Sequence, residues 1–299
     1  MQPRAYDFAI LAVGVAAVST AAVIIRETEA PAMVIAAYRI TFASIPLLAI
    51  AAVKRRVPLD RGRLVQLGLL AGVFIALHFS FWIASVKDTS IVTSVTLVAS
   101  QPLWVAIASG PVLKEPIPRA IWIGVAIGVV GALVMVSEDF GAGGDTLTGD
   151  LFALLGAIFA AGYILVGRIA RTEGAPLREY ISVSYPSGAV ILVLLALVSG
   201  ESFTGYSTET YGLLLLLALG PQLIGHTALN RSLGHLPAVT VAIAILGEPI
   251  GASILATTLL GEPPSVVEAV GGVILLIGVY LGVRASVARP EAVAVDTDG

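Results

Sequence analysis

Ten long apolar segments constrain the fold of this 299-residue chain more than any other feature of its sequence. A helix needs about 20 mostly apolar residues to cross the hydrocarbon core of a bilayer. Segments of this kind, separated by short polar clusters, cover residues 8–25, 31–53, 64–85, 91–112, 120–136, 151–169, 180–198, 211–230, 236–260 and 266–283. They predict an all-α membrane protein with ten transmembrane helices.

The composition argues against a water-soluble fold. Hydrophobic residues make up 57% of the chain and charged residues only 12%, whereas soluble domains carry about 25% charged residues. The segments lack the polar face of a soluble helix, and stretches such as 191–198 lack the two-residue alternation of a β-barrel strand. The first segment also allows an alternative interpretation as a cleaved signal peptide, although the repeat described below requires it as a span.

Several classes of function find no support in the sequence. The chain has no cysteine, and its net charge of −3 gives no basic surface for nucleic acid. It has neither the glycine-rich phosphate loop of an ATP-driven pump nor the motifs of common hydrolases. We therefore expect no enzyme, no cofactor, no metal ion and no nucleic-acid partner.

The positive charges predict the orientation of the chain. If the N-terminus is cytoplasmic, nearly all of the 17 lysines and arginines fall on the cytoplasmic side. Only Arg26 and Lys87 fall outside, and Arg39 lies within a span. This asymmetry follows the positive-inside rule. It predicts a multi-pass protein of the cell (inner) membrane with both termini in the cytoplasm and a disordered tail over residues 285–299.

The sequence contains an internal repeat. Shifting the chain by 147 residues places Gln101-Pro102 on Glu248-Pro249, and the Glu-Pro pair at 115–116 on the pair at 262–263. It also aligns the glycines at 124 and 131 with those at 271 and 278. Each copy holds five spans, an odd number, so the second copy must cross the membrane inverted. The predicted units are residues 1–148 and 149–284, an arrangement typical of secondary transporters with a substrate site between the repeats.

Six short motifs carry a resemblance to a known family. They lie at residues 37–39, 77–85, 100–103, 225–230, 246–251 and 260–263. With them the chain resembles the EamA-like branch of the drug/metabolite transporter superfamily over residues 5–284. The resemblance implies a ten-helix bundle with cytoplasmic termini and a central cavity lined mainly by helices 1, 3, 4, 6, 8 and 9. It also implies transport of amino acids, other small metabolites or drugs, often outward.

The sequence thus predicts a secondary transporter, an exporter or a facilitator, that moves small organic metabolites such as amino acids by alternating access. Its partners are then a small-molecule substrate and the lipid bilayer. A membrane-embedded enzyme and a channel-like pore are the alternatives. The first lacks a converging acid, base or metal cluster, and the second lacks polar rings along the spans.

Two prolines occupy matching places in the fourth and ninth spans. Pro102 and Pro249 each remove one backbone hydrogen bond and clash with the preceding turn, so both predict a break in the helix. Whether the breaks serve packing or form a hinge at the binding site stays open.

Two charged residues lie well inside spans, away from the span ends. Glu248 falls near the middle of the ninth span, where a charge is costly and usually faces a cavity or a partner. It is interpreted as a proton-coupling group, as a ligand for a substrate ammonium, or as a structural acceptor for Arg39, His226 or the backbone. Arg39 is interpreted either as an anchor that pairs with Glu248 or with helix-end carbonyls, or as a group that binds an anionic substrate or gates the pathway.

The remaining candidates are polar or aromatic side chains of the spans. His78 with Trp82, and His226 with Asn230, are each spaced four residues apart and so share a helix face. Either pair faces the cavity or bonds a neighbouring helix. The cavity and gating residues predicted from the sequence are Ser19, Thr20, Arg39, His78, Trp82, Gln101, Pro102, Tyr163, His226, Asn230, Glu248 and Pro249.

Glycines and Glu-Pro pairs complete the predictions. The spacings Gly124-x3-Gly128 and Gly278-x3-Gly282 allow close helix approach in the fifth and tenth spans. They serve packing within the bundle or, alternatively, a homodimer through these two helices. Glu115 and Glu262 precede prolines at span ends, and each is expected to help start the following helix.

Overall fold

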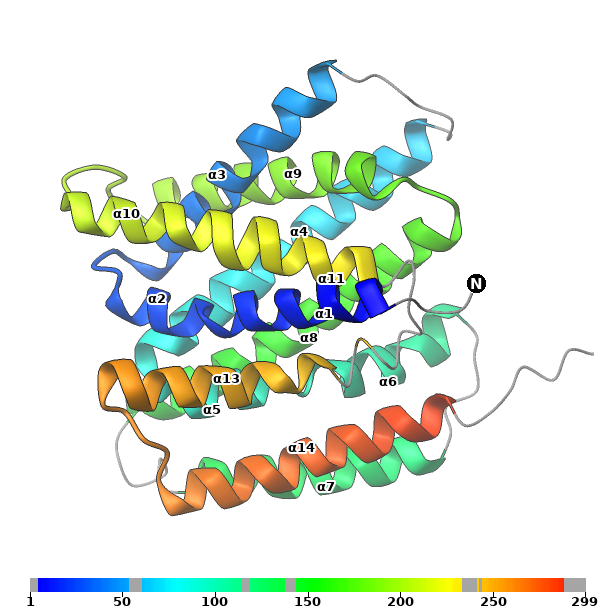
Figure 1. Ribbon diagram of the computed structural model, residues 1–299, viewed down its shortest axis with the longest axis vertical. Helices are drawn as coiled ribbons and strands as arrows, with labels where there is room; N and C mark the ends of the chain where they lie inside the picture. Colours follow the sequence, from blue (N-terminus) through cyan, green and yellow to red (C-terminus); the bar gives the residue numbers. More distant parts are fainter. Residues whose placement is uncertain are drawn as a thin grey trace, which may run out of the picture.

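The structure is a computed structural model that describes residues 5–53, 61–113, 119–137, 144–232, 241 and 244–287. Its elements in these ranges are all helical (Figure 1). In chain order they are α1 (Ala5–Ser19), α2 (Ala21–Glu27), α3 (Ala32–Val53), α4 (Arg61–Asp88), α5 (Ile91–Val98), α6 (Gln101–Leu113), α7 (Arg119–Met135), α8 (Gly144–Thr172), α9 (Leu177–Val198), α10 (Thr208–Leu217), η2 (Ala218–His226), α11 (Thr227–Ser232), α13 (Gly247–Leu255), η3 (Ala256–Leu260) and α14 (Val266–Val287).

The helices follow the predicted apolar segments. Seven are long and apolar enough to cross a membrane: Ala5–Glu27, Ala32–Ala49, Gly62–Asp88, Ile91–Val112, Thr146–Arg171, Leu177–Val198 and Thr208–Ser232. Two more, Arg119–Met135 and Val266–Gly282, are apolar but shorter. The predicted ninth segment and the predicted tail lie partly outside the described residues, and α14 continues to Val287, past the predicted start of that tail.

Serine side chains start several helices. Ser90 accepts a hydrogen bond of 2.9 Å from the backbone N–H of Thr93 at the start of α5, and Ser207 does the same for Thr210 at the start of α10. Such caps satisfy backbone donors that have no partner within the helix. Polar residues between the apolar segments therefore fix where the helices begin.

The first and last five segments pack with a reciprocal pattern. The third segment (α4) packs on the sixth (α8), and the eighth (η2 and α11) packs on the first (α1). The second segment packs on the seventh, as α3 on α9, and the fifth on the tenth, as α7 on α14. Each contact between a helix of the first half and one of the second has a counterpart in which the two halves exchange roles. A two-fold relation between the repeats requires such a pattern. The beginning of α1 and the end of α14 lie at the same end of the bundle (Figure 1).

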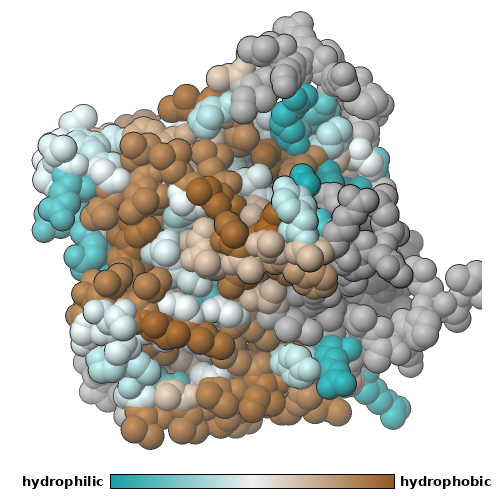
Figure 2. Space-filling view, viewed as in Figure 1, coloured by the Kyte–Doolittle hydropathy of each residue, from teal (hydrophilic) through white to brown (hydrophobic). Residues whose placement is uncertain are grey.

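The outer surface is apolar where lipid would cover it. Large hydrophobic side chains point outward on many helices, among them Val13, Ile45, Trp122, Val190 and Ile254. Figure 2 shows hydrophobic residues across the middle of one face and hydrophilic residues gathered toward its two ends. This distribution is that of a membrane protein whose helices run between two polar ends.

The predicted breaks in the fourth and ninth segments are confirmed. The fourth segment is interrupted between α5 and α6, at residues 99 and 100, just before Pro102. In the ninth, a turn at Leu246 separates the preceding helical residues from α13, again three residues before a proline, Pro249. The two breaks occupy the same position in the repeat.

The glycines of the fifth and tenth segments pack against one another within the chain. A Cβ atom on Gly124 would lie 2.6 Å from the carbonyl oxygen of Gly278, and one on Gly131 would lie 2.4 Å from the backbone nitrogen of Leu275. The small residues thus let α7 and α14 approach backbone to backbone. The predicted homodimer through these helices is therefore unsupported, because their glycine faces are already covered.

Candidate functional site

Arg39 is the central residue of the site. It lies in α3 with 0% of its surface exposed. Its Nε donates a hydrogen bond of 2.9 Å to Oε1 of Gln222 in η2, and its guanidinium carbon lies 4.0 Å from the centre of the Phe79 ring. The ring of Trp82 is 5.5 Å away. The bond joins the two halves, and both aromatic rings lie close enough to attract the cation.

The rest of the guanidinium group has no hydrogen-bond partner among the residues that the structure describes. Its two terminal nitrogens are buried and form no hydrogen bond with any of them. A buried cation with unused donors is costly unless another group pairs with it. This is the feature of the site that most needs an explanation.

Three tyrosines lie together, and one of them, Tyr185, adjoins Gln222. The Tyr185 hydroxyl lies beside Gln222, Thr227 and Tyr163, but it makes no hydrogen bond of ordinary geometry. The rings of Tyr163 and Tyr180 are 6.5 Å apart, and the Tyr180 hydroxyl is also buried without a partner. These unused hydroxyls lie in α9, on the second half of the chain.

The predicted residues Tyr163 and Asn230 meet here. The Asn230 side-chain nitrogen donates to the Tyr163 hydroxyl at 3.4 Å and to the backbone oxygen of His226 at 2.9 Å. These bonds join α8 to α11 and η2. The sequence-based prediction that both residues belong to one site is consistent with this contact, although their role in transport stays a prediction.

His78 and Trp82 share one face of α4, as their spacing predicts. Their rings stack 5.8 Å apart with an angle of 3° between their planes. His78 Nδ1 lies 2.9 Å from the carbonyl oxygen of Gly156 in α8, so this nitrogen carries a proton and donates. The ring of His226 is nearly perpendicular to the ring of Phe79, and the two ring centres are 5.7 Å apart.

Glu248 lies in the first turn of α13 and is half-buried. Its charge interacts with that of Arg39, but the two side chains form no ion pair within 4.0 Å. The interpretation of Arg39 as a direct partner of Glu248 is therefore wrong for this conformation. Gln222 of η2 is the direct hydrogen-bond partner of Arg39 instead.

We refer to these residues together as the central cluster. It comprises Arg39, His78, Phe79, Trp82, Tyr163, Tyr180, Tyr185, Gln222, His226 and Asn230. Most of its side chains are buried, so they occupy the region where a central cavity was expected. We refer to this packed arrangement as the closed conformation.

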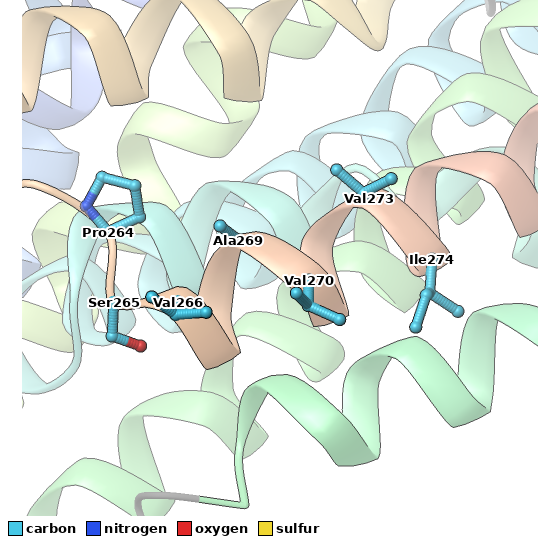
Figure 3. Close-up of a pocket in the computed structure, with 7 residues that line it drawn as sticks. All are labelled: Pro264, Ser265, Val266, Ala269, Val270, Val273 and Ile274. Carbon is cyan, nitrogen blue, oxygen red and sulfur yellow. The ribbon is translucent and has the colours of Figure 1, made fainter.

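The cavities of the described residues include two that lie apart from the cluster. An open groove of about 460 Å³ follows the outer side of α14 from Pro264 to Ile274 (Figure 3). A smaller one of about 160 Å³ lies between α3 and α9, beside Tyr38 and Phe203. Both are lined almost entirely by apolar atoms, which suits lipid chains better than a polar solute.

Other predicted site residues make contacts elsewhere. The hydroxyls of Ser19 and Thr20 donate to the carbonyl oxygens of Val15 and Ala17, at the break between α1 and α2. Gln101 begins α6 and is half-buried. None of these three has a described contact with the central cluster, and their part in transport stays a prediction.

One end of the bundle is joined across the two halves by polar contacts. Glu268 near the start of α14 accepts hydrogen bonds from Ser90 and Thr93 of the first half, and it caps its own helix at Ser265. Thr89 donates to Asp150 at 2.8 Å. We call these contacts the closed end.

Two cations predicted to lie outside the cytoplasm strengthen the closed end. Arg26 donates to the backbone oxygen of Thr89 at 2.5 Å, and Lys87 donates to that of Thr28 at 2.7 Å. Arg26 also lies 3.7 Å from Glu262. The prediction that Glu262 starts the following helix is therefore wrong, since Glu268 caps α14. Glu115 lies outside the described residues.

The opposite end has a two-point ion pair between the halves. Arg63 Nε and a terminal nitrogen donate to the Glu173 carboxylate at 3.1 and 2.9 Å. These hydrogen bonds hold the pKa of Glu173 below its ordinary value. Both side chains are substantially exposed, so the pair is weak.

The sequence-based reasoning missed Gln222, Tyr185, Tyr180 and Phe79. Gln222 and Tyr185 each adjoin a proline inside an apolar segment, at Pro221 and Pro186. A polar side chain in the middle of an otherwise apolar span is a signal in itself. Applying that criterion to every span would have found both residues.

Comparison with known proteins decides the family. The model of the EamA-like transporter family matches residues 5–137 and 147–284. The chain belongs to the EamA-like transporter family. As a member of this family within the drug/metabolite transporter superfamily, it is a multi-pass transporter of the cell membrane and not an enzyme.

Relatives of this EamA-like transporter carry little information on substrate. An uncharacterized transporter of Archaeoglobus fulgidus is 27% identical over 83% of this chain and 86% of that protein. The pseudopaline exporter CntI of Pseudomonas aeruginosa is 27% identical over 60% of this chain and 61% of its own length. A solved crystal structure with 16% identity, covering 96% of this chain and 100% of that one, superposes with a TM-score of 0.66 and supports the fold.

The central cluster also bears on metal binding. The described residues contain no group of three or more histidines, cysteines or acidic residues placed to hold a metal ion. His78 and His226 instead contact Gly156 and aromatic rings.

Proposed function

We propose that this EamA-like transporter is a secondary transporter that exports small organic metabolites, such as amino acids or related compounds, by alternating access. The substrate passes through the central cluster, between the two five-helix halves. The N- and C-termini lie in the cytoplasm, as the distribution of lysine and arginine indicates.

The hydrogen bond between Arg39 and Gln222 carries this proposal. It places a fully buried cation at the contact between the first and second halves, with Gln222 near the middle of the helix Thr208–Ser232. Charged groups inside a membrane usually mark substrate or ion pathways. In transporters built from inverted repeats, substrates bind at this contact.

The two ends of the bundle support alternating access. The closed end joins the halves through Glu268, Thr89 and Asp150, whereas among the described residues the opposite end holds the exposed pair of Arg63 and Glu173. With the proposed orientation, the closed end faces outward. The matching breaks before Pro102 and Pro249 provide places where the fourth and ninth segments can bend.

Outward transport is supported by one relative. The similar protein of Pseudomonas aeruginosa exports pseudopaline. Because the match covers 60% of this chain, it supports the direction of transport more than the identity of the substrate.

Counterflow in proteoliposomes tests the proposal. Vesicles loaded with an unlabelled metabolite take up the same labelled compound from outside, and a carrier gives exchange that saturates with concentration. The variant Gln222→Leu should lower this exchange at least tenfold, while Gln66→Leu, at an exposed glutamine in α4, should preserve it. A flux that stays linear with concentration indicates a pore and contradicts the proposal.

A further inference from the structure

We infer that the terminal nitrogens of Arg39 bind a carboxylate group of the transported molecule. This inference rests on the proposed function, because it names the chemical class of substrate that the central cluster recognises. It follows from the donors that the closed conformation leaves unused.

The geometry of the guanidinium group selects the direction of approach. Its N–H donors lie in its plane, and its central carbon lies over the Phe79 ring, 4.0 Å from the ring centre. Gln222 uses the Nε edge. The two terminal nitrogens remain as a planar fork, and they are buried with no hydrogen-bond partner in the described part of the chain. A carboxylate matches such a fork with two parallel hydrogen bonds.

Further polar groups lie close by on the second half of the chain. The hydroxyl of Tyr185 lies within reach of Gln222, Thr227 and Tyr163, and the charge of Arg39 interacts with Tyr185. These groups can satisfy one another, whereas the two terminal nitrogens of Arg39 have no hydrogen-bond partner among the described residues. Buried polar atoms in native proteins nearly always have partners, so two unpaired donors on one buried cation point to a polar ligand group.

The charges around Arg39 favour one negative charge on the ligand. A histidine side chain carries no negative charge, so neither His78 nor His226 supplies a counter-ion. Glu248 is close enough to interact with Arg39 but forms no ion pair within 4.0 Å. A carboxylate brings one negative charge to the Arg39 cation, whereas a phosphate ester brings nearly two and so buries more excess charge in the membrane.

Paired ligands test this inference directly. Small organic carboxylates are compared with their own primary amides, using thermal stabilisation of the purified protein and the fluorescence of Trp82 in a variant with Trp104→Phe and Trp122→Phe. Trp82 reports on the site because its ring lies 5.5 Å from the guanidinium carbon. The carboxylates should bind about 10- to 100-fold more tightly than the amides.

Variants then assign the effect to Arg39. Arg39→Gln should remove the preference for carboxylates, and Arg39→Lys should retain only part of it, because lysine lacks the planar fork. Arg119→Gln changes an exposed arginine at the start of α7 and should have no effect. Because Arg39 variants risk misfolding, Gln222→Glu gives a second test: its internal carboxylate pairs with Arg39 and should weaken ligand carboxylates at least tenfold.

The outcomes separate this inference from the proposed function. Saturable counterflow of an amide as good as that of its carboxylate, or phosphate esters bound more tightly than carboxylates, overturns the inference and leaves transport intact. Failure of every carboxylate to bind, or unchanged binding in Gln222→Glu, also overturns it. Absence of saturable exchange with all compounds overturns the proposed function itself.

Discussion

The side chains of Arg39 and Gln222 form a buried hydrogen bond of 2.9 Å between α3 and η2. Both residues are fully buried. The other two guanidinium nitrogens of Arg39 form no hydrogen bond with the described residues. The nine-residue π-helix η2, which contains Pro221, positions the amide. Wide helical turns of this kind are frequent at functional sites.

Replacing Gln222 by leucine should destabilise the protein. The change removes the acceptor of Arg39 and leaves the whole buried cation without a hydrogen bond, so we expect the free energy of unfolding to fall by about 1.5–3 kcal/mol. Unfolding by detergent in mixed micelles measures this difference. Gln66→Leu is the matched control, because Gln66 is exposed. Equal stability of the two variants would mean that Arg39 finds another partner in the membrane.

The sequence predicted the helices well because their signal is local. Apolar length determines where a span can lie. The interruptions before Pro102 and Pro249 were predicted from the prolines, although Pro46 and Pro186 lie inside helices that are not interrupted. The spacing of His78 and Trp82 likewise predicted that they share a helix face. Each of these properties depends on residues close together in the chain.

Contacts between distant spans were much less predictable. The sequence offered Glu248 or helix-end carbonyls as partners of Arg39, with an anionic substrate or a gating role as the alternative. In the structure its Nε bonds to a neutral amide 183 residues away in the chain. The glycines of α7 and α14 indicated close helix approach, but not that the partner lies in the same chain. Which distant side chains meet depends on how the helices cross, and the packing of the whole bundle sets how they cross.

Removing the carboxylate of Glu268 should loosen the closed end. This side chain accepts hydrogen bonds from Ser90 and Thr93, which hold the start of α14 to that of α5. In Glu268→Ala we expect a loss of stability of about 1.5–3 kcal/mol and wider opening at this end. Because the chain has no native cysteine, Ser94→Cys provides a buried reporter whose maleimide labelling should become about tenfold faster.

The control for the closed end is Glu209→Ala. Glu209 lies exposed in the first turn of α10, where Ser207 already caps the helix. Labelling of Ser94→Cys should stay at its original rate in this background. Unchanged labelling in Glu268→Ala would contradict the assignment of these contacts as an end that opens.

A methyl group at Gly131 should disturb the packing of α7 on α14. Its Cβ would lie 2.4 Å from the backbone nitrogen of Leu275, and neither backbone can move without shifting a helix. We expect Gly131→Ala to lower the free energy of unfolding by about 1–3 kcal/mol. Gly212→Ala, where a Cβ meets nothing within 4 Å, should instead be neutral or slightly stabilising. Thermal unfolding compares the two.

Size-exclusion chromatography with light scattering checks the same variants for assembly. Since α7 and α14 cover each other's glycines, Gly131→Ala should change the stability of the protein and leave its oligomeric state as it is. A dimer in the wild type that dissociates in Gly131→Ala would show that these glycines face another subunit.

The ion pair of Arg63 and Glu173 should make a small contribution to stability that depends on pH. Arg63 lowers the pKa of Glu173 in the folded state below its ordinary value of 4.5. The folded protein therefore releases this proton more readily than the unfolded chain, so the contribution is present above pH 4.5 and disappears as the pH falls through the lowered pKa.

The melting temperatures of the wild type and Glu173→Gln should differ at pH 7 and converge in acid. Arg63→Gln should give the same difference, and the double variant no further loss, because both changes remove one interaction. A difference that persists unchanged in acid would assign the effect of Glu173 to something other than its charge.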